Sequence, residues 1–287
     1  MGETSGVPVL VEMVNSPAPL MDNGIDFRLL APSTLVSFDQ VLAADAVAAL
    51  YLRLRAERNA ASPQVRACAA KLGSRQIIPF IIEDTQQELW PNNFEDLGTL
   101  RSTEGTDLMR AELADPKAPP YRRAAVKVAA AWALARSGET EPHTQWLMEH
   151  ARSWVDNLKN VGRDVRETNW RAFDFLTTLK TAGLREFFER ALESPNPEAL
   201  EPALIYLCLN YSDSRPCREK LLDLLHSNLP GIDWTTLECF AWQSGDAEIE
   251  AAMERNADLV AVDPFYSWAK QSASYRNFYL GNHLWKK

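Results

Sequence analysis

The chain has 287 residues, of which 46% are hydrophobic and 24% are charged, with 12 glycines and 17 prolines. This composition excludes a collagen-like, low-complexity or disulfide-stapled protein, and no apolar run approaches the roughly 20 residues of a membrane-spanning helix. Thirty Lys and Arg residues against 39 Asp and Glu give a net charge of −9. That charge disfavours nucleic-acid binding, which normally needs a clustered positive surface.

The excess negative charge is concentrated in two parts of the chain. Residues 1–50 hold one basic and six acidic residues, and residues 201–250 hold three basic and nine acidic residues. Such segments are either a solvated surface or a docking face for a basic partner. The four cysteines show no C-x-x-C spacing, and no secretory signal pattern precedes the first predicted element. We therefore expect a reduced, cytoplasmic protein that binds no membrane.

The first 36 residues differ from the rest of the chain. Residues 7–14 have the composition of a strand, and Asp22-Asn23-Gly24 predicts a turn before a second apolar run at 25–30. We therefore expect residues 1–36 to form a short β-hairpin or another extended, non-helical element, ahead of a helical domain over residues 37–287.

From residue 37 onward the signals are helical. Ser37 and Gln40 have the spacing of a capping box, Pro63 follows a cap residue, and Gly73 is a helix stop. Residues 91–118 are expected to be an irregular connection with a single helix near 107–114. The other helices are predicted at 41–58, 62–72, 76–88, 120–136, 140–160, 164–182, 184–193, 197–211, 215–227, 234–243, 247–256 and 264–271.

The predicted helices pair as antiparallel hairpins with a regular period. The first helices of successive pairs begin near residues 120, 164, 197 and 233, which are 44, 33 and 36 residues apart. A period of about 30–47 residues with two helices per unit is typical of an α-solenoid. Each helix carries an apolar stripe that one hairpin cannot bury alone, so stacking of neighbours would stabilise the fold.

Some of these helices resemble a known repeat. Residues 62–73, which read Ser-Pro-Gln-Val-Arg-Ala-Cys-Ala-Ala-Lys-Leu-Gly, resemble the first helix of a HEAT-like (armadillo/HEAT-type) repeat, and residues 77–83 resemble the second. Residues 123–125 and 133–138 echo the same pattern. The resemblance implies a right-handed α-solenoid and a binding scaffold, and it carries over no functional site because the matching residues are packing residues.

Motifs for nucleotide and hydrolytic chemistry are absent from the sequence. There is no G-x-G, no P-loop, no G-x-S-x-G and no H-E-x-x-H, so we expect no cofactor. His143 and His150 lie seven residues apart on one predicted helix, about 10.5 Å along its axis, which is too far to share a metal. With Trp146 and Trp154 they form a stripe that either packs against the next hairpin or binds a partner.

Two further segments have unusual composition. Glu83-Asp84-x-x-x-Glu88 loosely resembles the magnesium-binding motif of all-helical terpene synthases, but the second metal motif of that class has no match, so we expect a solvated helix end there. Residues 264–287 interleave seven aromatic residues with basic ones. We expect this segment to cap the end of the solenoid, while a protein-binding patch or a stacking surface for single-stranded nucleic acid are the alternatives.

The predicted second helices of successive hairpins carry many carboxylates. If these helices line the concave face of a solenoid, their carboxylates form an acidic groove that attracts a basic protein. The sequence therefore predicts a non-catalytic binding scaffold or adaptor, for example an immunity or inhibitor protein, of unspecified oligomeric state. The alternative is an all-helical enzyme or small-ligand carrier with a Trp-lined pocket. The candidate partner-binding residues are Glu189, Glu193, Glu219, Asp223, Glu250, Glu254, Trp146, His150 and Trp154.

Overall fold

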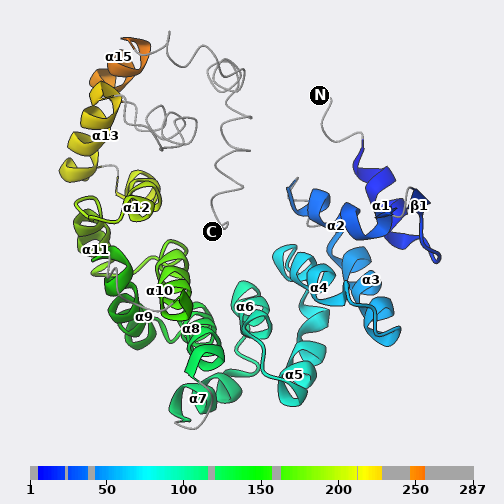
Figure 1. The fold of residues 1–287 in the computed structure, drawn as a ribbon. Coiled ribbons are helices and arrows are strands. Elements are labelled where there is room, and N and C mark those ends of the chain that lie inside the picture. Colours follow the sequence, from blue (N-terminus) through cyan, green and yellow to red (C-terminus); the bar gives the residue numbers. More distant parts are fainter. Residues whose placement is uncertain are drawn as a thin grey trace. The chain divides into compact units, whose positions relative to one another are not determined.

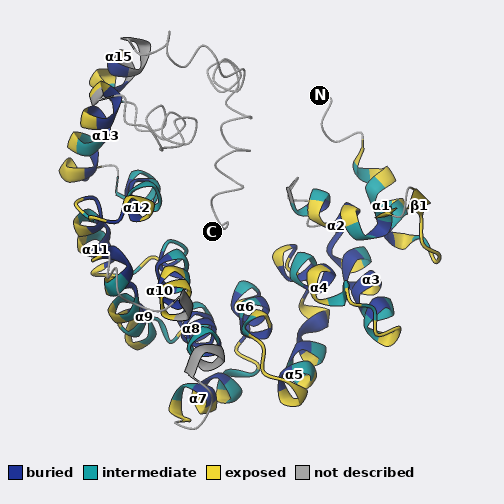
Figure 2. Ribbon diagram, viewed as in Figure 1, coloured by how far each residue is buried: buried dark blue, intermediate teal, exposed yellow. Residues whose placement is uncertain are grey.

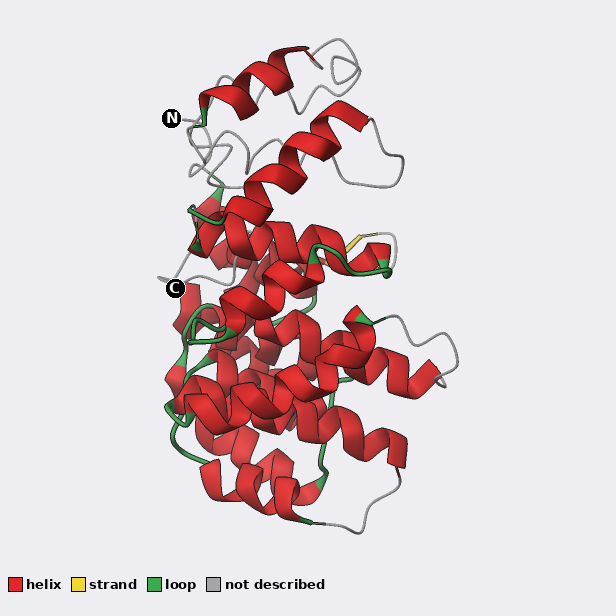
Figure 3. Cartoon of the chain, turned by 90° about the vertical axis from the view of Figure 1, so that its left-hand side faces the viewer, coloured by secondary structure: helices red, strands yellow, loops and turns green. Residues whose placement is uncertain are grey.

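Most of the described chain is α-helical. The computed structural model describes residues 6–22, 25–37, 43–115, 120–156, 163–211, 213–227 and 246–255. Within these ranges the only β-structure is one pair of two-residue strands (Figure 1, Figure 3). The predicted all-α class is therefore confirmed. Among the described helices, none has both the length and the apolar composition that a membrane crossing requires.

The chain divides into two compact units, residues Met1–His143 and Thr144–Lys287, each of which is described by itself. Helix α9 (Thr140–Val155) crosses their boundary, and unit 2 continues with α10 (Arg163–Leu176), α11 (Leu184–Ala191), α12 (Pro197–Asn210), α13 (Arg215–Ser227) and α15 (Ala247–Arg255). Unit 1 contains α1 (Val7–Asn15), β1 (Met21–Asp22), β2 (Ile25–Asp26), α2 (Phe27–Ser37), α3 (Ala44–Ala56), α4 (Ser62–Lys71), the 3-10 helix η2 (Arg75–Ile77), α5 (Ile78–Gln87), α6 (Pro91–Thr99), α7 (Thr106–Ala114) and α8 (Pro120–Ser137).

The amino-terminal segment is more helical than its composition predicts. The expected strand at residues 7–14 is wrong, because this segment forms α1, which has proline in its first turn and packs on α2 and α3. The expected hairpin is confirmed only as β1 paired antiparallel with β2. The second apolar run turns helical after Asp26, whose carboxylate accepts the backbone N–H of Arg28 at 3.1 Å and so caps α2. Arg28 also holds the pKa of the Asp26 carboxyl below its usual value.

The expected irregular connection over 91–118 is wrong as well. Residues 91–99 form α6, with Pro91 in its first turn, and α7 confirms the helix predicted near 107–114. Gly98 does not break α6. A Cβ at this glycine would lie 2.5 Å from the Trp132 ring and 2.9 Å from the Cα of Ala133, so glycine allows α6 and α8 to approach closely.

The core of unit 1 lies between successive helices. Helix α3 packs on α4, α4 on α6, and α6 on α8, which α7 also contacts. Tyr51, Leu54, Ile81 and Phe94 are fully buried between them. The helices carry buried and exposed stripes along their length (Figure 2), as expected for amphipathic helices in a globular protein. The predicted capping box is not seen, because Ser37 is the last residue of α2 and Gln40 lies outside the described residues.

Unit 2 has an aromatic core. Phe188 of α11 stacks on Tyr206 of α12 with ring centroids 4.0 Å apart, and Phe173 of α10 meets Phe188 edge-on at 5.4 Å. Asn196 caps α12 by accepting the backbone N–H of Glu198, and its amide donates to the carbonyl of Trp154 at 2.9 Å. The helices predicted at 234–243 and 264–271, and the expected cap over 264–287, lie outside the described residues.

Candidate functional site

Side-chain contacts join the three helices on which the sequence predicts a stack of carboxylates. Lys220 Nζ of α13 lies 3.7 Å from an oxygen of Glu193, just after α11. Arg218 Nε donates to Asp246 Oδ2 at 2.6 Å. Asp246 in turn caps α15 by accepting the backbone N–H groups of Glu248 and Ile249. Because α13 therefore contacts the end of α11 and the start of α15, their charged residues lie together.

We call this set of charged residues the charged ladder. It contains five basic and eight acidic residues, so its net charge is negative. The basic members are Arg185, Arg190, Arg215, Arg218 and Lys220, and the acidic members are Glu186, Glu189, Glu193, Asp213, Glu219, Asp223, Asp246 and Glu248.

Several predicted partner-binding carboxylates in the charged ladder are already paired. Glu189 accepts from Arg185 Nε at 3.1 Å and from the Ser214 hydroxyl at 2.7 Å. Glu219 accepts from Arg215 Nε at 2.7 Å. The pKa of the Arg218 guanidinium is raised by its hydrogen bonds to Asp246 and Glu248. The sequence pattern places these acids correctly on neighbouring helices but does not reveal that arginines stand between them.

Other acidic members of the charged ladder are available to a partner. The Glu193 side chain is 78% exposed. Glu186 and Asp223 are exposed, and neither makes a hydrogen bond or ion pair with the residues that the structure describes. Glu250 and Glu254 belong to α15, but their side chains lie outside the described part of the chain. A cationic side chain that reaches Glu186 or Asp223 would therefore meet no competing ion pair among the described residues, whereas at Glu193 it would compete with Lys220.

The aromatic stripe of α9 divides into a surface part and a buried part. Trp146 and His150 are half-buried and stack with ring centroids 3.7 Å apart, and His150 Nδ1 lies 2.9 Å from the Trp146 carbonyl oxygen. Trp154 is only 6% exposed, and the Arg166 guanidinium lies 5.4 Å from its ring. Of the predicted partner-binding residues on α9, Trp146 and His150 therefore offer surface to a partner and Trp154 offers little. His143, on the same helix, lies 3.3 Å from Glu139.

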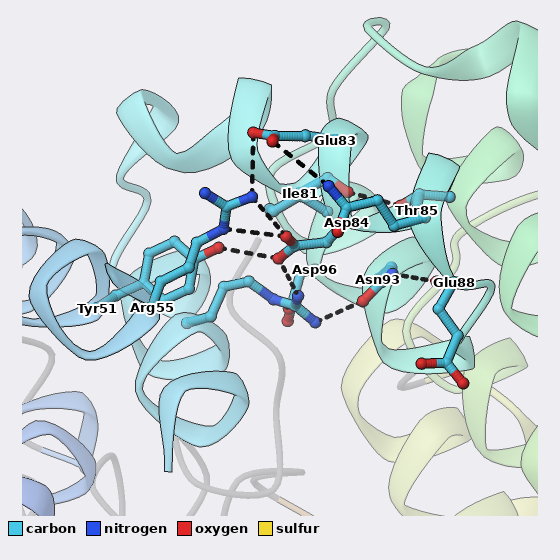
Figure 4. A network of polar contacts seen from close by, with 11 residues as sticks. Tyr51, Arg55, Ile81, Glu83, Asp84, Thr85, Glu88, Asn93 and Asp96 are labelled. Atoms are coloured by element: carbon cyan, nitrogen blue, oxygen red, sulfur yellow. Dashed lines mark hydrogen bonds and ion pairs between the residues drawn. The ribbon is translucent and has the colours of Figure 1, made fainter. Parts of the chain in front are cut away.

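The expected solvated helix end at Glu83 and Asp84 is wrong for Asp84. Figure 4 shows that the Asp84 carboxylate accepts from Tyr51 at 3.2 Å and from Arg55 at 2.8 Å. Arg66 Nη1 also donates to it at 3.3 Å. Asp84 is therefore only partly exposed, and it holds α5 against α3 and α4.

Arg66 is the centre of this polar network in unit 1. It is 4% exposed and donates to Asp96 at 2.6 Å and to Asn93 at 2.8 Å, in addition to Asp84. Burial raises the pKa of the Asp96 carboxyl to about 6, and the attraction of Arg66 opposes that rise. Burial and the nearby Asp84 charge raise the pKa of Tyr51 to about 12. With its polar groups bonded to one another, this network ties four helices together.

Most of the ion pairs between helices share a sequence spacing, although Arg66 and Asp84 are only 18 residues apart. In six pairs between helices or the turns beside them, the arginine comes first and the carboxylate follows 28–32 residues later. Two other pairs, Arg190 with Asp156 and Lys220 with Glu193, run in the opposite direction. The six pairs are Arg55–Asp84, Arg66–Asp96, Arg110–Glu139, Arg166–Glu198, Arg185–Asp213 and Arg218–Asp246.

No protein-family model and no curated protein matches this chain. The resemblance of residues 62–73, 77–83, 123–125 and 133–138 to HEAT-like repeats therefore stays an expectation from the sequence. The carboxylates of the charged ladder outnumber its cations. Fixed negative charges on adjacent helices attract and orient a positively charged surface.

Proposed function

We propose that the chain is a non-catalytic scaffold or adaptor that docks a basic protein on the charged ladder. The observation that carries this proposal is the contact of α13 with both α11 and α15, which gathers eight carboxylates against five cations. Electrostatic complementarity of this kind speeds association and selects against acidic competitors. An inhibitor or immunity protein that occludes a basic target is one concrete form of this function.

The architecture we propose is a HEAT-like, right-handed solenoid of stacked hairpins. Its support is the separation of 28–32 residues that recurs between the arginine and the carboxylate of six ion pairs. In a stack of repeats, a residue that bonds the matching position of the next repeat is separated from it in sequence by about one repeat length. In such a stack each repeat contacts only its neighbours. The charged ladder then continues from one repeat to the next.

Within the charged ladder, Glu186 and Asp223 are proposed to make the first contacts with the partner. Both are exposed and make no ion pair among the described residues, so a Lys or Arg of the partner displaces no internal cation. Glu219 is already bonded to Arg215, although its side chain is 55% exposed. A partner's cation at Glu219 would have to compete with that arginine.

The test compares two double variants that change the net charge equally. Glu186→Lys with Asp223→Lys alters the charged ladder, while Glu12→Lys with Glu57→Lys alters exposed carboxylates of unit 1. The full chain captures partners from a lysate of the source cells at about 50 mM salt, and captured proteins are tested for release at about 500 mM, where screening is short-ranged. The protein released at high salt is identified, purified and titrated against each variant.

We expect the variant of the charged ladder to bind the purified partner about tenfold more weakly than the native chain, mainly through slower association. The unit 1 variant should bind within about twofold of the native chain, because it leaves every carboxylate of the charged ladder unchanged. Equal weakening by both variants would show a net-charge effect and no docking face. Unchanged affinity in the variant of the charged ladder would refute the proposal.

A further inference from the structure

Two free thiols lie close together where α12 is followed by α13. Cys208, near the end of α12, and Cys217, in the first turn of α13, have Sγ atoms 3.5 Å apart. Cys217 is buried and Cys208 is half-buried, so Cys208 is the more accessible of the two. A disulfide bond is about 2.05 Å long, and its formation would need the two sulfur atoms to approach by only about 1.5 Å.

Neighbouring contacts hold Cys217 in this position. Its backbone N–H donates to the Ser214 hydroxyl oxygen at 3.4 Å, and that hydroxyl donates to Glu189 of α11 at 2.7 Å. The start of α13 is therefore anchored to α11. The hydrogen bond with Cys217, together with burial, raises the pKa of the Cys208 thiol. Since the thiolate is the reactive form, we expect the pair to react slowly at neutral pH.

We propose that Cys208 and Cys217 are a reversible redox pair, which a small-molecule disulfide such as oxidised glutathione converts into a disulfide between α12 and α13. In the first step the Cys208 thiol loses its proton and attacks one glutathione sulfur, which forms a mixed disulfide and releases one reduced glutathione. Cys217 then attacks the Cys208 sulfur and releases the second. The two cysteines lose two electrons, and oxidised glutathione accepts them. This proposal is independent of the charged ladder.

The experiment measures disulfide formation in the full chain. Folded chain and chain unfolded in urea are equilibrated in the same glutathione redox buffer, quenched with an alkylating reagent and digested with trypsin. Because Arg215 precedes Pro216, trypsin leaves both cysteines in one peptide, residues 191–218. The disulfide form of this peptide is two hydrogens lighter than the dithiol and carries no alkyl group, whereas the dithiol carries two.

We expect the ratio of disulfide to dithiol to be about tenfold higher in the folded chain than in the unfolded chain, equivalent to about 30 mV. The unfolded chain is a stringent reference, because only eight residues separate the two cysteines and the disulfide can also form there. An equal or lower ratio in the folded chain would overturn the proposal. So would a wild-type peptide that stops at the mixed disulfide with glutathione.

Two variants complete the design. Cys217→Ser should accumulate glutathione on Cys208, because the second thiol is missing, and its far-ultraviolet circular dichroism should match that of the native chain. Cys68→Ser, in unit 1, should leave the ratio for residues 191–218 unchanged. A Cys68→Ser variant that lost the disulfide would show that oxidation of Cys208 and Cys217 depends on a thiol of unit 1, and it would refute a pair that reacts by itself.

Discussion

Replacing Arg66 with methionine should destabilise unit 1 by about 3–5 kcal/mol, the usual effect of removing one partner from a buried ion pair. Methionine keeps much of the volume of arginine, so the loss is mainly electrostatic. Asp84 retains Tyr51 and Arg55 as donors, whereas Asp96, which is 5% exposed, loses its bond of 2.6 Å to a cation. The variant is therefore left with a buried carboxylate that lacks its counter-ion.

The size of this effect should depend on pH. The pKa of Asp96 is about 6 in the folded chain, above its ordinary value of 3.8. The folded chain therefore holds a proton that the unfolded chain has released, and the contribution of Asp96 to stability falls as pH rises from about 4 to about 6. Removing Arg66 raises that pKa further, so the variant keeps losing stability above pH 6. The gap between wild type and variant should widen by about 1 kcal/mol between pH 6 and pH 7.

The measurement is urea unfolding at pH 5, 6 and 7, with Arg55→Met as the matched control. Arg55 belongs to the same network, but its side chain is 26% exposed and it bonds the partly exposed Asp84 and Glu83. Its loss should therefore change stability by only about 0–1 kcal/mol, with little pH dependence between 5 and 7. Equal effects of the two substitutions, or a gap for Arg66→Met that does not change with pH, would refute the reasoning.

Three further substitutions test packing, capping and polar burial by chemical unfolding. Gly98→Ala should destabilise unit 1 by about 1–3 kcal/mol, because its Cβ would meet the Trp132 ring at 2.5 Å despite the better helix propensity of alanine. The control Gly73→Ala, with φ +85° and open space around it, should show only backbone strain of about 1–2 kcal/mol. Trp132→Leu should lessen the effect of Gly98→Ala only in part, because the contact with the Ala133 Cα remains; an unchanged or raised stability of Gly98→Ala itself would refute the steric argument. Asn196→Ala should lower stability by about 1–2 kcal/mol through loss of the cap of α12, and an unchanged transition would contradict the capping role. Ser74→Ala should leave stability unchanged or raise it by about 1 kcal/mol, because the Ser74 hydroxyl is buried without a hydrogen-bond partner among the described residues; a clear loss would show that a partner exists.

Local signals in the sequence predict most helix boundaries well. The predicted helix at 215–227 agrees with α13, and that at 120–136 agrees with α8 to within one residue. Proline and glycine begin or end a helix through local backbone geometry, so such boundaries can be predicted without knowledge of tertiary contacts. The wrong predictions lie where packing between helices, and no local signal, determines the structure. Strand-like residues 7–14 form a helix because the preference for strands depends on context, and Gly98 permits close packing within α6 instead of ending it.

The sequence predicts which helices carry the carboxylates of the candidate site, but not which of these carboxylates are bonded to arginines. The regular period places Glu189, Glu219 and Glu248 on helices that turn out to be in contact. Whether each carboxylate is free or bonded to an arginine depends on side-chain positions, which composition does not fix. For the same reason the sequence assigns Asp84 to solvent, although three side chains from α3 and α4 donate to it.

The direction of the six arginine–carboxylate pairs has a consequence for synthesis of the chain. In each pair the arginine is translated first and its carboxylate follows 28–32 residues later. At about 5–20 residues per second, the carboxylate is synthesised about 1.4–6.4 s after the arginine. Contacts over such short separations have a low entropy of loop closure and favour fast folding. The growing chain can therefore complete these ionic contacts in order from its amino-terminal side, while later residues are still being added.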